Sequence, residues 1–162
     1  PKMAFGTGHH ATTYMVSDAM FDVDLDGKSV LDYGCGTGVL AILGKRLGAG
    51  YTWAVDIELP SYENTLENAA TNQVELDVVT HGTLDDVDSS RTFDIILANI
   101  NRNVILASLP SLYERLNPGG LLFVSGILEH DGELVENTAL EAGFTVNRRQ
   151  KRQDWLAWVF NR

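Results

Sequence analysis

The sequence predicts an α/β fold: a doubly wound, mostly parallel seven-stranded sheet with an antiparallel edge and helices on both faces. Short apolar runs alternate along the chain with segments of helical periodicity, which is typical of parallel strands joined by helices. A glycine-rich turn follows the first apolar run, at a place where such sheets often bind a ligand. The 162 residues, 44% of them hydrophobic, are enough for one folded domain, and we expect residues 1–162 to form it.

The opening stretch, PKMAFGTGHHATTYMV, is expected to begin as a loop and to continue as a helix. Gly6 and Gly8 indicate the loop, because glycine adopts backbone angles that other residues resist. Apolar side chains at helical spacing then predict a helix that starts near His10 or Ala11.

Seven short segments have the apolar or alternating pattern of strands. In chain order the expected strands are Lys28–Tyr33, Tyr51–Asp56, Leu76–Thr80, Phe93–Ala98, Leu121–Gly126, Phe144–Gln150 and Trp155–Phe160. The last two are close in sequence and form a hairpin, which provides the antiparallel edge.

Four further helices are expected between these strands. They are Val39–Leu47, Tyr62–Thr71, Val104–Arg115 and Gly132–Ala142. The first has Lys45 and Arg46 in its last turn and Gly48 as its stop, and Gly143 stops the last one. The third ends before a turn at Asn117-Pro118-Gly119-Gly120.

The composition excludes several classes of protein. The formal net charge of −10 argues against a broad nucleic-acid surface, which needs clustered cations. No apolar run reaches the length of a membrane span and no signal-peptide pattern is present, so we expect no membrane contact. Cys35 is the one cysteine, which rules out an intramolecular disulfide and fits a cytoplasmic protein.

The segment VLDYGCGTGVLA predicts a ligand site at the turn from the first strand into its helix. Gly34, Gly36 and Gly38 let the backbone pass close to a ligand. Their G-x-G-x-G spacing differs from the G-x-G-x-x-G of dinucleotide sites. Asp32 precedes them, and its carboxylate would repel a pyrophosphate but attract an ammonium group. The sequence therefore favours S-adenosylmethionine, which has an ammonium and a sulfonium but no phosphate.

Asp56 ends the second expected strand, where an acidic side chain can accept hydrogen bonds from both ribose hydroxyls. Such a residue also occurs in NAD enzymes, so it indicates a nucleoside without identifying it. The alternative is that Asp56 caps the next helix.

The chain resembles the PrmA family, which methylates the eleventh protein of the large ribosomal subunit. The resemblance rests on AFGTGHHATT, VLDYGCGTGVLAI, VDI, ILANI, NPGGLLFVSGIL and DWLAWVF, and it runs from Met3 to Phe160. It implies a class I methyltransferase domain that uses S-adenosylmethionine to trimethylate α-amino and lysine amino groups of one ribosomal protein. Carried over by position, it implies cofactor contacts at Thr13, Gly34, Asp56 and Asn99.

The sequence departs from the family in two respects. Leu59-Pro60-Ser61-Tyr62 follows Asp56 where the family usually has an acidic residue, proline and small apolar residues, although Glu58 keeps one acid nearby. The family also carries an N-terminal substrate-recognition domain, to which nothing in this sequence corresponds. We therefore expect the chain to bind S-adenosylmethionine normally but to methylate the ribosomal protein poorly.

The resemblance also explains the opening stretch. In the family FGTGHHATT folds over the cofactor, which implies that Phe5, His9 and His10 lie at the substrate entrance, and we place Trp155 there as well. His9 and His10 are not expected to bind a metal, because adjacent histidines point in different directions and no Cys, Asp or Glu lies within a few residues.

Asn99 is the residue that we assign to catalysis. It follows the fourth expected strand, and its amide oxygen can accept a hydrogen bond from an attacking amine and orient the lone pair. The backbone carbonyl of Ile100 can help. The alternative is an asparagine that caps the next helix. The amine must be neutral to react, and no residue in the sequence identifies itself as the base.

Two other features are interpreted as structural. Cys35 is a small packing residue rather than a nucleophile. The basic run near the C-terminus is a solvated or edge-protecting feature rather than a contact to ribosomal RNA. Its members are Arg148, Arg149, Lys151 and Arg152.

Three classes of function remain open. The first is a methyltransferase for amino groups of a ribosomal protein, and the second is a methyltransferase for a small amine or another protein side chain. The third is a nucleoside-binding module that is not an enzyme. Asn99 and the complete opening stretch argue against the third class.

Overall fold

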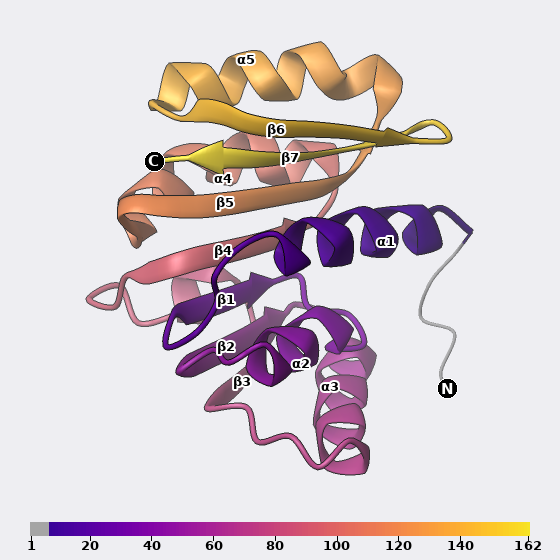
Figure 1. The fold of residues 1–162 in the computed structure, drawn as a ribbon, viewed down its shortest axis with the longest axis vertical. Helices are drawn as coiled ribbons and strands as arrows, with labels where there is room; N and C mark the ends of the chain where they lie inside the picture. The colour runs from indigo at the N-terminus through magenta and orange to yellow at the C-terminus, as the bar shows by residue number, and fades with distance from the viewer. Residues whose placement is uncertain (1–6) are drawn as a thin grey trace.

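A computed structural model of the chain describes residues 7–162, and side chains from Ala11 onward. One seven-stranded sheet is surrounded by helices (Figure 1). The strands are β1 (Ser29–Tyr33), β2 (Tyr51–Asp56), β3 (Val78–His81), β4 (Phe93–Asn99), β5 (Leu116–Leu128), β6 (Thr145–Arg152) and β7 (Trp155–Asn161). The helices are α1 (Thr7–Phe21), α2 (Val39–Arg46), α3 (Leu59–Thr71), α4 (Arg102–Arg115) and α5 (Gly132–Ala142), with short 3₁₀ turns at Leu84–Asp86 and Glu129–Asp131.

The sheet has the order β3-β2-β1-β4-β5-β7-β6 and confirms the predicted fold class. The strands β1 to β5 are parallel, while β7 pairs antiparallel with both β5 and β6. The chain first moves outward from β1 to β3 and then returns to the other side of β1 with β4. This reversal lies between β1 and β4, where sheets of this class open a crevice at the carboxyl ends of their strands.

Both faces of the sheet are buried, which explains the continuous apolar runs of the central strands. Alternate residues of one strand serve opposite faces, so Val30 packs with the core beneath α1 and α2, while Leu31 packs with the core beneath α4 and α5. Figure 1 shows α1 crossing the front of the sheet and α4 behind it. The site residues on β1 and β4 are therefore carried by the buried centre of the sheet.

Several predicted boundaries were wrong. The helix α1 begins at Thr7, so Gly8 belongs to its first turn and not to a loop. The helix α3 begins at Leu59 rather than Tyr62, because Pro60 fits the first turn of a helix.

The turn expected at residues 117–120 is instead part of β5. Phe93 of β4 pairs with Leu116 and Ile95 pairs with Leu121, so the four residues between these partners bulge out of the strand pair. Gly119 has a φ of +83° within this bulge. The Pro-Gly-Gly segment therefore interrupts the hydrogen-bonded pairing of β5 with β4. Because this pairing resumes after the bulge, the residues before and after it belong to one strand.

The basic run of β6 is engaged by acidic and aromatic side chains of the helices and of the turn before α5. Arg148 bonds Asp18 of α1 and Asp22, which directly follows α1. Arg149 bonds Glu136 of α5, Lys151 bonds Glu129, and the Arg152 guanidinium lies 4.0 Å from the ring centroid of Tyr14. These contacts fasten the edge hairpin to the two helices, in keeping with a structural role.

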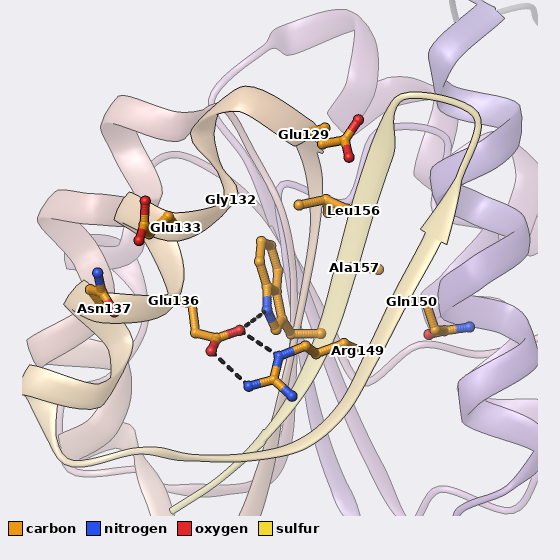
Figure 2. Close-up of a pocket in the computed structure, with 10 residues that line it drawn as sticks. Glu129, Gly132, Glu133, Glu136, Asn137, Arg149, Gln150, Leu156 and Ala157 are labelled. Carbon is orange, nitrogen blue, oxygen red and sulfur yellow. Dashed lines mark hydrogen bonds and ion pairs between the residues drawn. The ribbon is translucent and has the colours of Figure 1, made fainter.

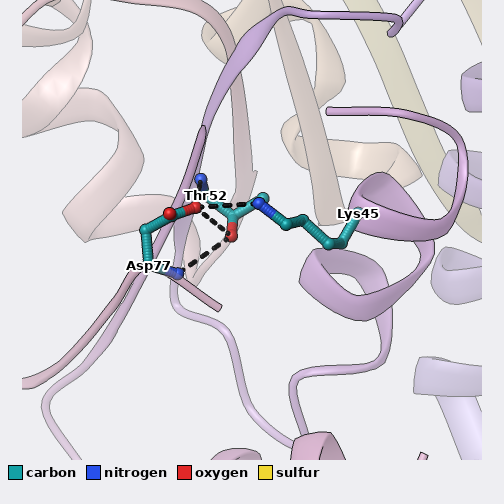
Figure 3. Close-up of polar contacts among 3 residues, drawn as sticks. All are labelled: Lys45, Thr52 and Asp77. Atoms are coloured by element: carbon teal, nitrogen blue, oxygen red, sulfur yellow. Dashed lines mark hydrogen bonds and ion pairs between the residues drawn. The ribbon is translucent and has the colours of Figure 1, made fainter. Parts of the chain in front are cut away.

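A group of polar contacts also links the elements at the other edge of the sheet, near β3 (Figure 3). Asp77 accepts hydrogen bonds from the Thr52 amide at 2.8 Å and from the Lys45 ammonium at 3.0 Å. One carboxylate thus joins α2, β2 and the segment before β3. Among the described residues, no helix has the length and apolar character needed to cross a membrane.

Candidate functional site

A cavity of about 430 Å³ opens at the carboxyl ends of the parallel strands. It brings together seven residues that the sequence placed at the site: Thr13, Asp32, Gly34, Gly36, Asp56, Asn99 and Trp155. It also contains residues that the sequence analysis did not assign to the cofactor: Cys35, Thr37, Val39, Leu40, Glu58, Ser61, Ile100, Asn101 and Gly126.

The glycine turn after β1 lets two backbone segments meet at the floor of this cavity. Gly34 has a φ of +82°, and a Cβ there would lie 2.5 Å from Cγ2 of Ile100 and 2.8 Å from the carbonyl oxygen of Asn99. A Cβ at Gly36 would meet no atom within 4 Å, so this part of the turn borders open space. Gly34 is thus needed for packing, and Gly36 leaves room for a ligand.

Gly38, which the sequence places at the cofactor, is not among the residues that line the cavity. It is the N-cap of α2 with a φ of +82°, and a Cβ there would lie 2.8 Å from Cγ2 of Thr65 on α3. The third glycine therefore permits the close approach of α2 and α3. Thr65 in turn donates a hydrogen bond to the Gly36 carbonyl at 3.0 Å.

Asp32 borders the cavity, but its side chain is buried so deeply that water cannot solvate the carboxylate. The residue is 1% exposed, and neither carboxylate oxygen has a hydrogen-bond partner among the described residues. Burial, and after it the charge of Asp56, raise the pKa of Asp32 from 3.8 to about 7, and the backbone amide of Ala41 opposes this shift. An unpaired buried carboxylate is costly, which indicates a site prepared for a cationic group.

Asp56 fixes the shape of the cavity wall. Its Oδ2 accepts a hydrogen bond from the Gly36 amide and its Oδ1 accepts one from the Glu58 amide, both at 2.9 Å. The bond to Glu58, the N-cap residue of α3, partly fits the capping alternative. The bond to Gly36 shows a further role, because it holds the glycine turn, and each oxygen retains a lone pair for a ligand.

Asn99 is the last residue of β4, and it does not cap the following helix. That role belongs to Asn101, whose Oδ1 accepts a hydrogen bond from the Val104 amide at 3.0 Å. The capping alternative for Asn99 is therefore wrong. Within the described part of the chain, the side-chain amide of Asn99 has no hydrogen-bond partner, so it is available to a ligand at the cavity.

The helix α1 and the strand β7 close the cavity from two sides. Thr13 projects from α1, and Trp155 stands at the start of β7. Trp158 packs instead in the core beneath α4 and α5 and is 3% exposed. Phe5 and the side chains of His9 and His10 lie outside the part of the chain that the structure describes, so their expected place at the entrance stays a prediction.

The cavity has the electrostatic character of a cation site. Its lining includes the carboxylates of Asp32, Asp56 and Glu58 and has no lysine or arginine among the described residues. A phosphate would be repelled there, whereas an ammonium or sulfonium would be attracted. Cys35 offers no nucleophile, because burial and then the charge of Asp32 raise the pKa of its thiol well above the usual range.

A second cavity, of about 420 Å³, lies between α5 and the β6–β7 hairpin (Figure 2). Glu136 accepts two hydrogen bonds at 2.8 Å from the Arg149 guanidinium and one at 2.9 Å from the Trp158 indole. The bonds from Arg149 hold the pKa of Glu136 below its usual range. The charge of Glu136 is thus neutralised by Arg149, and the pair links α5 to the β6–β7 hairpin. This second cavity therefore offers no free carboxylate at Glu136, unlike the first cavity with its unpaired Asp32.

Comparisons with known proteins agree with this geometry. The sequence model of the family described as "Ribosomal protein L11 methyltransferase (PrmA)" matches residues 1–162. The ribosomal protein L11 methyltransferase of Porphyromonas gingivalis is 42% identical over 160 residues, which are 99% of this chain and 55% of that protein. The protein of the same name from Methylococcus capsulatus is 40% identical over 158 residues, 96% of this chain and 53% of that protein. The chain thus spans about half the length of these curated relatives.

Solved structures share the fold. The ribosomal protein L11 methylase of Lactobacillus delbrueckii subsp. bulgaricus superposes with a TM-score of 0.89 at 30% identity, over 94% of this chain and 79% of that chain. A methyltransferase from Pyrococcus furiosus has a TM-score of 0.75 at 18% identity, over 92% of this chain and 80% of that chain, and shows the likeness of the fold alone.

Proposed function

Because the chain belongs to the PrmA family of ribosomal protein L11 methyltransferases, we propose that it transfers methyl groups from S-adenosylmethionine to amino groups of a large-subunit ribosomal protein. The acceptors are the N-terminal α-amine and lysine side chains. The observation that carries the proposal is the acidic cavity between β1 and β4, where the strand order reverses. The buried Asp32 carboxylate and the Asn99 side-chain amide both line it, and neither has a hydrogen-bond partner among the described residues.

The residues of the cavity fit S-adenosylmethionine. The unpaired Asp32 carboxylate suits the ammonium of the ligand, and the Asp56 oxygens, already oriented by Gly36 and Glu58, suit the two ribose hydroxyls. The open space beside Gly36 leaves room for a ligand next to the backbone. When bound, this cofactor supplies a methyl group that is already activated by the sulfonium.

The protein's task is to present a neutral amine. The lone pair of the amine nitrogen forms the new N–C bond. The C–S bond breaks at the same time, and the electron pair of that bond stays on sulfur. A proton then leaves the product amine to solvent. Free α-amines and lysines have pKa values near 8 and about 10.4, so desolvation at the cavity must favour the neutral form. Asn99 accepts a hydrogen bond from the amine and orients its lone pair.

Replacement of Asp56 by alanine is expected to weaken cofactor binding by about 2–3 kcal/mol, because charge-assisted hydrogen bonds to the ribose are lost. The Gly36 amide also loses its acceptor, which adds to the effect. Calorimetric titration with S-adenosylhomocysteine measures the change. Asp88→Ala, which likewise removes a carboxylate bonded to a backbone amide but lies outside the cavity, is the control. Unchanged affinity in Asp56→Ala would withdraw the ribose assignment.

Transfer of tritium from labelled cofactor into a cell extract tests the function. Labelling of a single small basic protein is expected. Labelling of a soluble small product would favour the second candidate, a small-amine methyltransferase. Absence of any transfer, together with intact cofactor binding, would favour a nucleoside-binding module.

The remaining proposals concern context. We propose that residues 1–162 form one methyltransferase domain, supported by the single sheet and the cores on its two faces. We further propose that it acts in the cytoplasm on its protein acceptor, without direct nucleic-acid or membrane contact. The curated relatives extend well beyond the matched region, so acceptor recognition can draw on residues that these relatives have outside it.

A further inference from the structure

The helix α3 donates hydrogen bonds to two carbonyl groups of the glycine turn. The Thr65 hydroxyl donates to the Gly36 carbonyl at 3.0 Å, and the Asn68 side-chain amide donates to the Thr37 carbonyl at 2.9 Å. Thr65 is fully buried, and Asn68 is half-buried. Neither of them is among the described residues that line the cofactor cavity, so both reach the site through the turn.

Gly36 depends on hydrogen bonds for its conformation, because it has no side chain and borders open space. A Cβ there would meet no atom within 4 Å, and the residue has a φ of +58°. Glycine permits many backbone conformations, so contacts between atoms do not fix this one. The Gly36 amide donates to Asp56 and the Gly36 carbonyl accepts from Thr65, which fixes the residue at both ends.

The bonds at Gly36 belong to a closed ring that runs through α3. Asp56 accepts the Gly36 amide with one carboxylate oxygen and the Glu58 amide with the other. Glu58 is the N-cap of α3, and Thr65 follows it about two helical turns later on the same face. The glycine turn is therefore held between Asp56 and α3, and loss of the bond to Thr65 opens the ring.

The turn presents one unpaired polar group to the cavity. Thr37 is 5% exposed and lines the cavity, and its hydroxyl has no hydrogen-bond partner among the described residues. Buried hydroxyls are normally paired, so this one indicates a place for a polar group of a ligand. The direction of the hydroxyl depends on the backbone of Thr37, whose carbonyl is held by Asn68.

We propose that Thr65 and Asn68 are positioning residues of the cofactor site. They hold the carbonyl groups of Gly36 and Thr37 toward α3, so the open space beside Gly36 and the Thr37 hydroxyl are in place before the ligand binds. A site that is already ordered loses less conformational entropy on binding, which raises its affinity. This inference rests on the proposed function and adds to it two residues that act through the turn.

The test compares Thr65→Ala with Thr65→Ser. Both variants lose the methyl group that lies near Gly38, but only Thr65→Ser keeps the hydroxyl. Thr52→Ala is the control, because it removes an equally buried threonine hydroxyl that bonds Asp77 and lies outside the cavity.

Calorimetric titration with S-adenosylhomocysteine measures the binding. We expect Thr65→Ala to bind about five- to tenfold more weakly than the wild type, the effect of one lost hydrogen bond. Thr65→Ser and Thr52→Ala should stay within about twofold of the wild type. Wild-type affinity in Thr65→Ala, or a loss of equal size in Thr65→Ser or Thr52→Ala, would overturn the proposal.

Asn68→Ala provides a second variant in case Thr65→Ala does not fold. It should also bind about five- to tenfold more weakly, because the Thr37 carbonyl loses its donor. Its control is Asn72→Ala, since the Asn72 side-chain amide donates to the Asn68 carbonyl at the C-terminal end of α3 and not to the turn. Unchanged affinity in Asn68→Ala, or an equal loss in Asn72→Ala, would contradict the proposal.

Hydrogen exchange of the Gly36 amide in the ligand-free protein tests the positioning without the cofactor. This amide donates to Asp56, so it exchanges when the turn opens. Its exchange should be about five- to tenfold faster in Thr65→Ala, while the Gly50 amide, bonded to Lys28 at the other end of the strands, keeps its rate. An unchanged Gly36 rate would refute the positioning role. A wild type that does not bind S-adenosylhomocysteine would instead refute the proposed function, and the exchange rates would still decide the positioning role.

Discussion

Asp32→Asn is expected to make the unliganded protein more stable at pH 8 and to weaken its binding of S-adenosylmethionine about 30-fold. Asp32 is fully buried, and its carboxylate oxygens have no hydrogen-bond partner in the described structure. The charge is therefore a cost to folding that a cationic ligand can offset. Loss of a charged interaction with the ligand's ammonium corresponds to about 2 kcal/mol, which gives the expected fold-change.

The sign of the pH dependence follows from the direction of the shift. The folded protein has an Asp32 pKa of about 7, above the ordinary 3.8. The contribution of Asp32 to stability is thus fully present below pH 4 and is lost as pH rises through 7. At about 1.4 kcal/mol per pKa unit, the cost of the carboxylate grows by about 2–3 kcal/mol between pH 5 and pH 8. The stability gain in Asp32→Asn should grow by that amount.

Urea unfolding at pH 5 and pH 8 measures this gain, and calorimetry measures the affinity. The side-chain amide that Asp32→Asn introduces would also be unpaired, which reduces the net gain at pH 8 to about 2 kcal/mol. Asp94→Asn is the matched control, because Asp94 accepts bonds from Ser29 and Asn117 at the opposite end of the strands. It should lose stability and keep its cofactor affinity. A pH-independent difference between wild type and Asp32→Asn would contradict the assignment of the shift to Asp32.

Cofactor affinity should show the complementary pH dependence. The ionised carboxylate attracts the ligand, so wild-type affinity for S-adenosylmethionine should fall as pH drops below 7, by at most about tenfold per pH unit. The Asp32→Asn variant should lack this dependence. The Asp32 carboxylate would then account both for the lower stability of the free protein at high pH and for its preference for a cationic ligand.

The fold could be predicted because its signals are local and repeated. The central strands are short apolar runs, and their alternation with helices implies a parallel sheet, whose carboxyl ends then gather Asp32, Asp56 and Asn99 at one place. Boundaries failed where distant pairing decides the outcome. The Pro-Gly-Gly segment looks like a turn, yet β5 pairs with β4 on both sides of it.

The close contacts of Gly126 could not be read from the sequence for a similar reason. Gly126 is significant only because β5 bulges beside the end of β4 and brings it under Asn99, a relation of two strands that no local pattern encodes. Gly38 shows the reverse case. The motif assigned it to the ligand by its spacing, and the structure shows that the packing of α2 on α3 also requires a glycine there. Motifs thus located the cavity, while close contacts between segments decided each glycine's role.

Asn99→Ala is expected to lower turnover by about 10- to 100-fold and to weaken cofactor binding less. The side-chain amide has no partner among the described residues, and it lies at the cofactor cavity. Alanine removes the acceptor that we propose for the amine, so the lone pair is oriented less often toward the methyl group. Single-turnover transfer from labelled cofactor to the ribosomal protein, at saturating cofactor, measures the loss separately from binding.

The matched control is Asn117→Ala, which removes an asparagine at the other end of β5, bonded to Asp94 and away from the cavity. It should keep wild-type turnover. Asn99→Asp adds a sharper criterion: a carboxylate stabilises the protonated amine and raises its pKa, so the pH–rate profile should shift to higher pH. If Asn99→Ala turned over at the wild-type rate and Asn99→Asp kept the wild-type profile, the amine would be positioned by other groups, and Asn99 would have no part in catalysis.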